Sequence, residues 1–276
     1  MTTRSFSDAA LNAVTGEARK SMEAFAQALV QAEGLLREYH ATTQAQFKSS
    51  HPDEMIAIRE NSRLIFTLSW TKAVLFSRAI IDQVNAGNLL AAFQSLRAYA
   101  ELVATVRFTA KEMMPLIQDA AETGSISVEN ARTLSSKLNT LLHGGRFNWP
   151  LYFEEGAKAV LDRKRAKTTK EERRKFETNS LRVGTCFEKW AEEEPAVEFI
   201  YDYLCDLVHP NKGSNLILLV ERGGNVVFDT SPSSQMGWVI FGRIFPFAAS
   251  MCLRAMGEFQ PIFALLGAED EARSVH

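Results

Sequence analysis

The sequence predicts a mainly α-helical fold, a multi-helix bundle with one β-hairpin inserted before the last long helix. Three observations support this fold class. Long stretches are rich in Ala, Leu, Glu, Gln and Arg, which favour helices, while Gly and Pro are scarce, at 15 and 8 of 276 residues. Only one segment, at about 215–229, shows a strand pattern around a pair of glycines. The long apolar stretch after it is typical of a buried helix.

The first five expected helices are separated by residues that begin or end helices. Asn85–Asn88 form a turn so short that the helices on either side should pack as an antiparallel hairpin. Pro115 is expected to begin a new, shorter helix, and Ser127 to cap the next one, which ends at Gly144. The five helices are expected at about 7–47, 52–84, 89–112, 115–124 and 125–142.

The second half of the chain carries clear stop signals. Pro195 should open a helix that His209-Pro210 ends, and the pair Gly223-Gly224 supplies the positive φ of a tight hairpin turn. The expected elements are a turn at 148–150, a broken and highly charged helical segment to 194, a helix over 196–208, strands at 215–220 and 226–229, a cap at 231–234 and a last helix ending near 267.

The chain length suits one large domain or two small ones, and we predict a single helical domain over residues 1–276. Hydrophobic residues are 46% and charged residues 23% of the chain, which excludes a disordered or fibrous protein. The parts of the predicted domain are an N-terminal long helix (1–50), a helical hairpin with following helices (51–145), a charged helical arm (146–194) and a final part with a helix, the β-hairpin and a long apolar helix (195–267).

Charge and cysteine content narrow the function classes. The net charge of −2 excludes a global attraction to nucleic acids or membranes and leaves only a local patch. Cys186, Cys205 and Cys252 form no close pair, which excludes a disulfide framework or a Cys-rich zinc site and favours a reducing compartment. The N-terminus has no apolar segment typical of a signal peptide. We therefore expect a cytoplasmic protein, and we predict no cofactor.

Two apolar segments, 64–84 and 236–267, approach the length of a membrane span. Each carries charged residues, among them Lys72 and Arg243, that would be costly in the middle of a bilayer. We therefore expect both to be buried core helices and expect no association with a membrane.

The strongest candidate for chemistry is His209, in the last turn of a helix and directly before Pro210. The negative end of a helix dipole favours positive charge on a nearby histidine, and a histidine exchanges protons near neutral pH. The alternative is a capping histidine that binds the free carbonyls of the helix end.

An acidic stripe leads up to this histidine. Asp206 and His209 have the spacing by which helical bundles take two metal ligands from one helix, but such sites need a second helix of the same kind. No second helix carries this pattern, so we predict no metal and a solvated acidic face. The stripe consists of Glu198, Asp202, Asp206 and His209.

Arg97 and Glu101 lie four residues apart in an apolar helix, where they should form a pair or point into a cleft. A structural ion pair is the alternative to a role in a site. Arg243 and Arg254 share one face of the last helix, which Glu258 extends. We expect a polar pocket formed by Arg97, Glu101 and His209 with Tyr203, Asp206, Asn211, Lys212, Arg243 and Arg254.

A basic segment at 158–175 could bind phosphates, and its candidate contacts are Arg163, Lys164, Arg165, Lys167, Lys170, Arg173 and Arg174. The alternative is a solvated arm, because no aromatic residue in its centre could stack on bases. Phosphate-binding loops and nucleophile elbows are absent from the sequence.

The turn at Gly87-Asn88, the sequence Leu96-Arg97-x-x-x-Glu101, the segment Tyr203–Pro210 and the hairpin after it resemble a family of uncharacterised, mostly helical bacterial proteins. That family is similar to HEPN-like proteins, the helical bundles associated with RNA and nucleotides in prokaryotic defence and toxin systems. The resemblance covers about 64–253. It implies a role in stress or phage defence and a polar site at Arg97, Glu101 and His209.

HEPN ribonucleases place an arginine four to six residues before the catalytic histidine. The corresponding positions here are Asp202, Tyr203 and Leu204, so an arginine of the site would have to come from another helix.

The resulting hypothesis is an HEPN-like protein that either binds RNA or nucleotides or cleaves them, in the second case as a metal-independent ribonuclease. His209 would be the general acid or base, an arginine would stabilise the phosphate, and Glu101 would orient that arginine. One alternative is a non-enzymatic dimeric interaction module, and another is a sensor of a small anion. Expected partners are RNA or a nucleotide, a second copy in a homo-oligomer, and another protein.

Overall fold

The computed structural model describes residues 5–43, 54–123, 125–144, 149–166, 181–210, 212–228 and 235–267. Within these residues the chain forms helices and a single two-stranded antiparallel sheet, which confirms the predicted fold class. The helices are α1 (Asp8–Asn12), α2 (Glu17–Thr43), α3 (Glu54–Asn85), α4 (Leu89–Thr123), α5 (Val128–His143), α6 (Trp149–Ala166), α8 (Val183–Ala191), α9 (Ala196–Val208), α10 (Lys212–Leu216) and α11 (Gln235–Gly267). The strands are β1 (Leu219–Arg222) and β2 (Asn225–Phe228).

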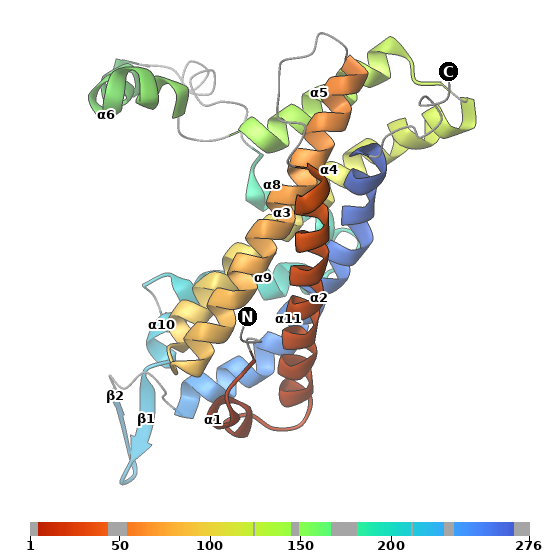
Figure 1. Cartoon of the computed structure of the whole chain (residues 1–276). Coiled ribbons are helices and arrows are strands. Elements are labelled where there is room, and N and C mark those ends of the chain that lie inside the picture. Colours follow the sequence, from red (N-terminus) through yellow and green to blue (C-terminus); the bar gives the residue numbers. More distant parts are fainter. Residues whose placement is uncertain are drawn as a thin grey trace.

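The long helices α2, α3, α4 and α11 run side by side in one elongated bundle (Figure 1). Helix α4 lies at its centre, because it contacts α3, α5, α8, α9 and α11. Helices α3 and α4 form the expected antiparallel hairpin. Its turn needs Gly87, whose φ of 71° is in the left-handed region. The hairpin of β1 and β2 lies at one end of the bundle, and α6 lies to one side of the other end (Figure 1).

Two expectations for the first half are wrong. The expected helix over 7–47 is divided into α1 and α2, because the chain turns at Gly16 with a φ of 60°. Pro115 does not begin a new helix but lies inside α4. A proline removes one backbone donor, and the buried Ala110 and Met113 just before it anchor this part of α4 in the core. The expected cap at Ser127 is confirmed, since its hydroxyl accepts from the N–H of Asn130 at 3.1 Å.

In the second half, α9 has the predicted bounds, but the expected strand at 215–220 begins later. Residues 212–216 form α10, with Gly213 and Ser214 buried. Helix α10 takes only residues 215–216 of the expected strand, a turn follows at 217–218, and the apolar run that remains forms the start of β1. The positive φ expected of the glycine pair is confirmed, at 59° for Gly223 and 81° for Gly224, and the turn is only these two residues long, because Arg222 pairs with Asn225. The expected turn at 148–150 is wrong for Trp149 and Pro150, which begin α6, while Asn148 and the expected cap at 231–234 lie outside the described residues.

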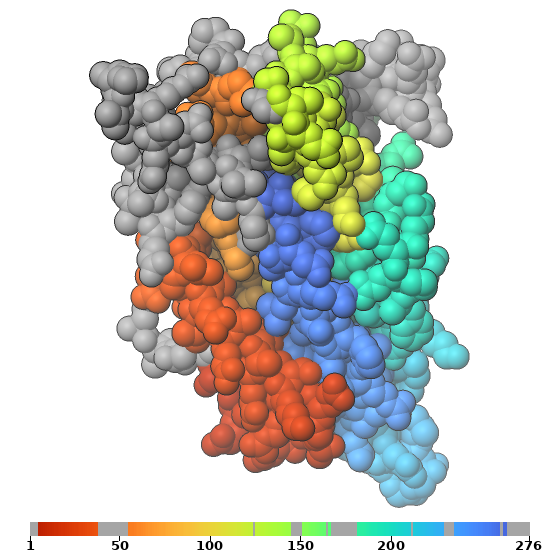
Figure 2. Space-filling model, turned by 90° about the vertical axis from the view of Figure 1, so that its right-hand side faces the viewer, coloured from red at the N-terminus to blue at the C-terminus, as the bar shows by residue number. Residues whose placement is uncertain are grey.

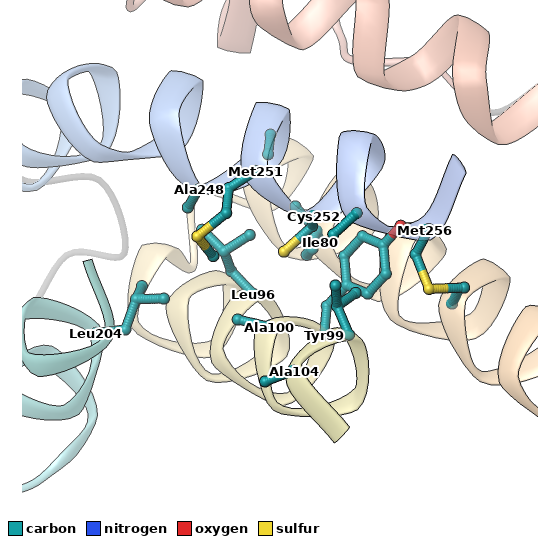
Figure 3. Close-up of a cluster of buried hydrophobic side chains, with 14 of the residues drawn as sticks. Ile80, Leu96, Tyr99, Ala100, Ala104, Leu204, Ala248, Met251, Cys252 and Met256 are labelled. Carbon is teal, nitrogen blue, oxygen red and sulfur yellow. The ribbon is translucent and has the colours of Figure 1, made fainter. Parts of the chain in front are cut away.

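The core is built where α4 meets α11. Small side chains such as Ala100, Ala104 and Ala248 let the two helices approach closely, and Met251 fills the space between them (Figure 3). An aromatic cluster continues this core toward α1 and α2. Its ring centroids lie 6.1 Å apart for Phe6–Phe245, 5.3 Å for Phe25–Phe245, 6.4 Å for Phe25–Tyr99, 4.8 Å for Phe241–Phe245 and 5.8 Å for Phe93–Phe241.

Two helical segments, Met55–Asn85 and Gln235–Phe259, are long and apolar enough to cross a membrane. In their most apolar windows, 39% and 50% of the residues are buried inside the bundle. Both helices contact each other and α4. Core helices of soluble proteins also have this length and composition, so the absence of a membrane association stays a prediction.

A buried charge joins α4 to two neighbours. The guanidinium of Arg107, whose side chain is 7% exposed, forms a 2.7 Å ion pair with Glu193, just after α8. Its Cζ lies 5.2 Å from the ring centre of Trp190 in α8 and 5.4 Å from that of Phe259 in α11. Lys111 adds a 3.0 Å contact to Glu193. Arg107 therefore has both an anionic partner and two aromatic faces, which offset the cost of its burial.

Phe245→Ala should lower the free energy of unfolding by about 3–5 kcal/mol, because it leaves a cavity in the aromatic cluster. Phe247→Ala is the matched control, since Phe245 is fully buried and Phe247 is 67% exposed on the same helix. The control should change stability by about 0.5 kcal/mol or less. Urea unfolding followed by circular dichroism measures both. Equal losses of stability in Phe245→Ala and Phe247→Ala would show that α11 does not pack against α1 and α2 as described.

Glu193→Gln should lower the free energy of unfolding by roughly 1–2 kcal/mol at pH 7, because the buried Arg107 loses its anionic partner. Hydrogen bonding from Lys111, together with Arg107, holds the pKa of Glu193 below its ordinary value of 4.5. The difference in the free energy of unfolding between wild type and Glu193→Gln should therefore have its full size above pH 4.5. It should disappear as the pH falls through the lowered pKa of Glu193.

The matched control is Glu192→Gln, whose ion pair with Lys189 is exposed. It should change stability by about 0.5 kcal/mol or less. If the stability difference between wild type and Glu193→Gln does not depend on pH, the charge of the Glu193 carboxylate does not stabilise the buried Arg107.

Candidate functional site

A polar cluster forms where the middle of α4 meets the end of α9. Arg97 Nε donates to Glu101 Oε1 at 2.9 Å within α4. Arg97 Nη1 lies 3.3 Å from His209 Nε2, although the two residues are 112 positions apart in the chain. The structure therefore brings together all three residues that were predicted as the catalytic set.

The end of α9 places His209 at this cluster. The residue before a proline avoids helical backbone angles, and His209 accordingly adopts an extended ψ of 152° before Pro210. Its N–H still donates to the carbonyl of Cys205 at 3.1 Å, which closes the last turn. Any non-proline residue at this position could make that backbone bond, and the imidazole itself contacts the guanidinium of Arg97.

Tyr201 and Cys205 complete the cluster. The Tyr201 hydroxyl donates to Glu101 Oε1 at 3.4 Å, and its ring stacks on Phe187 at a centroid distance of 3.8 Å. Arg97 Cζ lies 5.9 Å from the centre of the same ring. Glu101 is thus held by two donors from two helices, and a stacked aromatic pair fixes one side of the cluster.

Electrostatics define the protonation states around Arg97. Burial, together with Cys205 and Glu101, raises the pKa of Tyr201 to about 12, so its phenol is neutral and can donate at neutral pH. Burial also raises the pKa of the Cys205 thiol, although Arg97 acts in the opposite direction. For Arg97, burial would lower the pKa, but Cys205, Glu101 and Tyr201 outweigh it and raise the pKa. The guanidinium of Arg97 therefore stays positively charged at neutral pH.

The contact between Arg97 and His209 constrains how the imidazole can bond. A guanidinium has donors only, so the 3.3 Å contact is a hydrogen bond in the tautomer whose Nε2 accepts. An unprotonated Nε2 is the form that can take a proton from a substrate.

Three of the other expected pocket residues lie elsewhere. Tyr203, Arg243 and Arg254 line a separate cavity of about 840 Å³. This amphipathic cavity lies between the start of α2, α9 and the middle of α11. The reason is the helical spacing of α9. Tyr201 and Cys205 lie on one side of its buried stripe and Tyr203 on the other. The residues expected in a single polar pocket are therefore divided between two places, the cluster at Arg97 and this cavity.

Two more of the expected residues, Asp206 and Lys212, belong to the junction of α9 and α10. Asp206 lies against Gly213 of α10, and Lys212 is exposed at the start of α10. Asn211 lies outside the described residues. Arg254 pairs with Glu194, not with a residue of the cluster. Within the described part of the chain, no group of three His, Cys, Asp or Glu side chains could hold a metal ion.

Only part of the basic segment is described. Arg163 and Arg165 belong to α6, where Arg163 pairs with Glu155. Lys164 also lies in α6, but its side chain is outside the description, as are Lys167, Lys170, Arg173 and Arg174 as whole residues. Helix α6 and α10, which follows His209 closely, lie toward opposite ends of the molecule (Figure 1). The described part of the basic segment therefore does not lie beside the polar cluster.

Sequence reasoning missed Tyr201 and Cys205 as members of the site. The signal was present, because residues 201, 205 and 209 recur at a spacing of four and so share one side of α9. The acidic stripe at 198, 202 and 206, from which the pocket was predicted, lies on a neighbouring side of the helix. Phe187, the stacking partner of Tyr201, had no signal in the sequence.

Comparison of the chain with protein-family models, curated proteins and solved structures finds no match.

Gly213→Ala should destabilise the protein by about 1–3 kcal/mol through overpacking. A Cβ at this position would lie 2.8 Å from the carbonyl oxygen of Asp206 and closer still to its carboxylate. Gly257→Ala is the matched control, because no atom lies within 4 Å of its Cβ position in α11. The control should stabilise the protein by about 0.5–1 kcal/mol. Thermal unfolding of both variants measures these changes. A Gly213→Ala variant as stable as wild type would contradict the close packing of α10 on α9.

Proposed function

We propose that the protein is HEPN-like, acts in a bacterial stress or phage-defence setting, and binds an RNA phosphate or a nucleotide at Arg97 and His209. The observation that carries the proposal is the 3.3 Å contact between Arg97 Nη1 and His209 Nε2. The HEPN-like arrangement needs an arginine beside the histidine. Helix α9 has no arginine at the expected spacing before His209. Arg97 of α4 lies beside His209 instead.

The cluster has the groups that a phosphate requires. Arg97 is charged and oriented by Glu101, and its side chain is 23% exposed, so a ligand can reach it. His209 is exposed at the end of α9. A guanidinium binds phosphate oxygens through short, charge-assisted hydrogen bonds, which are stronger than its bond to a neutral imidazole. A bound phosphate would therefore attract Arg97 and release His209 Nε2.

The released Nε2 can act as a general base in RNA cleavage without a metal. It would take the proton of a ribose 2′-hydroxyl as the 2′ oxygen attacks the adjacent phosphorus. The bond from phosphorus to the 5′ oxygen breaks, the 5′ oxygen takes a proton from solvent, and a 2′,3′-cyclic phosphate forms. Arg97 would stabilise the charge that develops on the phosphate oxygens.

Binding is tested by fluorescence anisotropy with a labelled single-stranded RNA in the presence of EDTA. Arg97→Gln should weaken binding about tenfold or more, because it removes one charged phosphate contact. Arg182→Gln is the matched control, since Arg182 is exposed at the start of α8 and makes no cap hydrogen bond with its side chain. Equal binding by wild type and Arg97→Gln would refute the site.

Cleavage is tested on the same RNA by mass spectrometry of the products. Wild type should give fragments that end in a 2′,3′-cyclic phosphate, and a 2′-deoxy substitution at the cut position should prevent this. His209→Ala should keep the melting temperature within a few degrees and lose cleavage. Cleavage by His209→Ala at the wild-type rate would remove the catalytic role, while binding without any cleavage would leave a binding protein.

A further inference from the structure

We propose that the cavity between α2, α9 and α11 binds a small amphipathic anion, with an apolar body and a single carboxylate or sulfonate. This site is separate from the polar cluster at Arg97, and the inference does not rest on the proposed RNA function. Its volume of about 840 Å³ lies in the range of small-molecule sites in proteins.

Helix α11 forms the floor of this cavity. Figure 2 shows α11 in blue on one face of the molecule, between the red start of α2 and the teal segment with α8 and α9. Glu17 and Ser21 of α2 form one wall, and the stretch from Glu194 to Tyr203 forms the other. Three helices from distant parts of the chain thus enclose one hollow.

The lining is largely apolar, with aromatic rings at its surface. Phe199 of α9 and Phe247 of α11 are 63% and 67% exposed, which is unusual for rings that could pack in a core. Ile200 and Met251 line the cavity and are buried. An apolar ligand body placed here would cover both exposed rings.

One positive charge in the cavity, on Arg243, is available for a ligand. Arg254 is neutralised by its ion pair with Glu194. Arg243 is exposed and has no hydrogen bond or ion pair among the described residues. Glu17 lies on the opposite wall, in the first turn of α2, where the helix dipole stabilises its carboxylate. An anionic group on the ligand would give the guanidinium of Arg243 its missing partner.

The test compares two fluorescent probes with similar aromatic bodies, the anion 1-anilinonaphthalene-8-sulfonate and the neutral N-phenyl-1-naphthylamine. Titration of the folded protein should give one site that binds the anion about tenfold to a hundredfold more tightly than the neutral probe. Arg243→Gln should reduce the affinity for the anion to that for the neutral probe and leave the neutral probe unchanged. Phe247→Ala should weaken both.

Arg182→Gln is the control for loss of a surface arginine and should leave both affinities unchanged. Circular dichroism melting confirms that each variant is folded. Equal affinity of wild type for the two probes, or an Arg243→Gln variant that still prefers the anion, would overturn the proposal. Light scattering adds a further outcome. A dimer that excludes both probes and dissociates in Phe247→Ala would make this face an interface between copies and also overturn it.

Discussion

The close packing of α4 against α11 is the constraint on which the rest of the structure depends. Fully buried small residues, Ala100 on α4 and Ala248 on α11, let the two backbones approach, so the larger side chains around them have fixed positions. Helix α4 also contacts α3, α5, α8 and α9. Arg97 and Glu101 project from this central helix, and Arg107 holds α8 to it two to three turns further along. The polar cluster therefore stands on a helix that five other helices hold in place.

Local rules explain which features could be predicted from the sequence. Pro195 and His209-Pro210 fixed the bounds of α9, and Gly223-Gly224 the turn of the hairpin, because proline and glycine restrict the backbone by themselves. The pairing of Arg97 with Glu101 also follows from a spacing of four. Pro115 was misjudged because tertiary packing keeps α4 continuous across it. The contact of Arg97 with His209 depends on how α9 lies against α4, which no local pattern encodes.

Helix α9 separates two sites of different character. Its buried stripe, with Ile200 and Leu204, packs against the bundle, while Tyr201 faces the polar cluster and Tyr203 faces the cavity. Helical spacing alone places residues two apart, such as 201 and 203, on nearly opposite sides of α9, but which neighbours each side meets depends on how α9 packs against α4 and α11. A rotation of α9 would change both sites together.

The aromatic contacts of Phe6 and Phe25 with Phe245 have a consequence for how the chain folds during synthesis. These residues join the two ends of the described chain, so their loop closes only after most of the protein has been made. The hairpin of α3 and α4 can form early, because its turn is only a few residues long. Until α11 emerges, the apolar side of α2 lacks its final cover and remains a surface on which chaperones or other nascent chains can act.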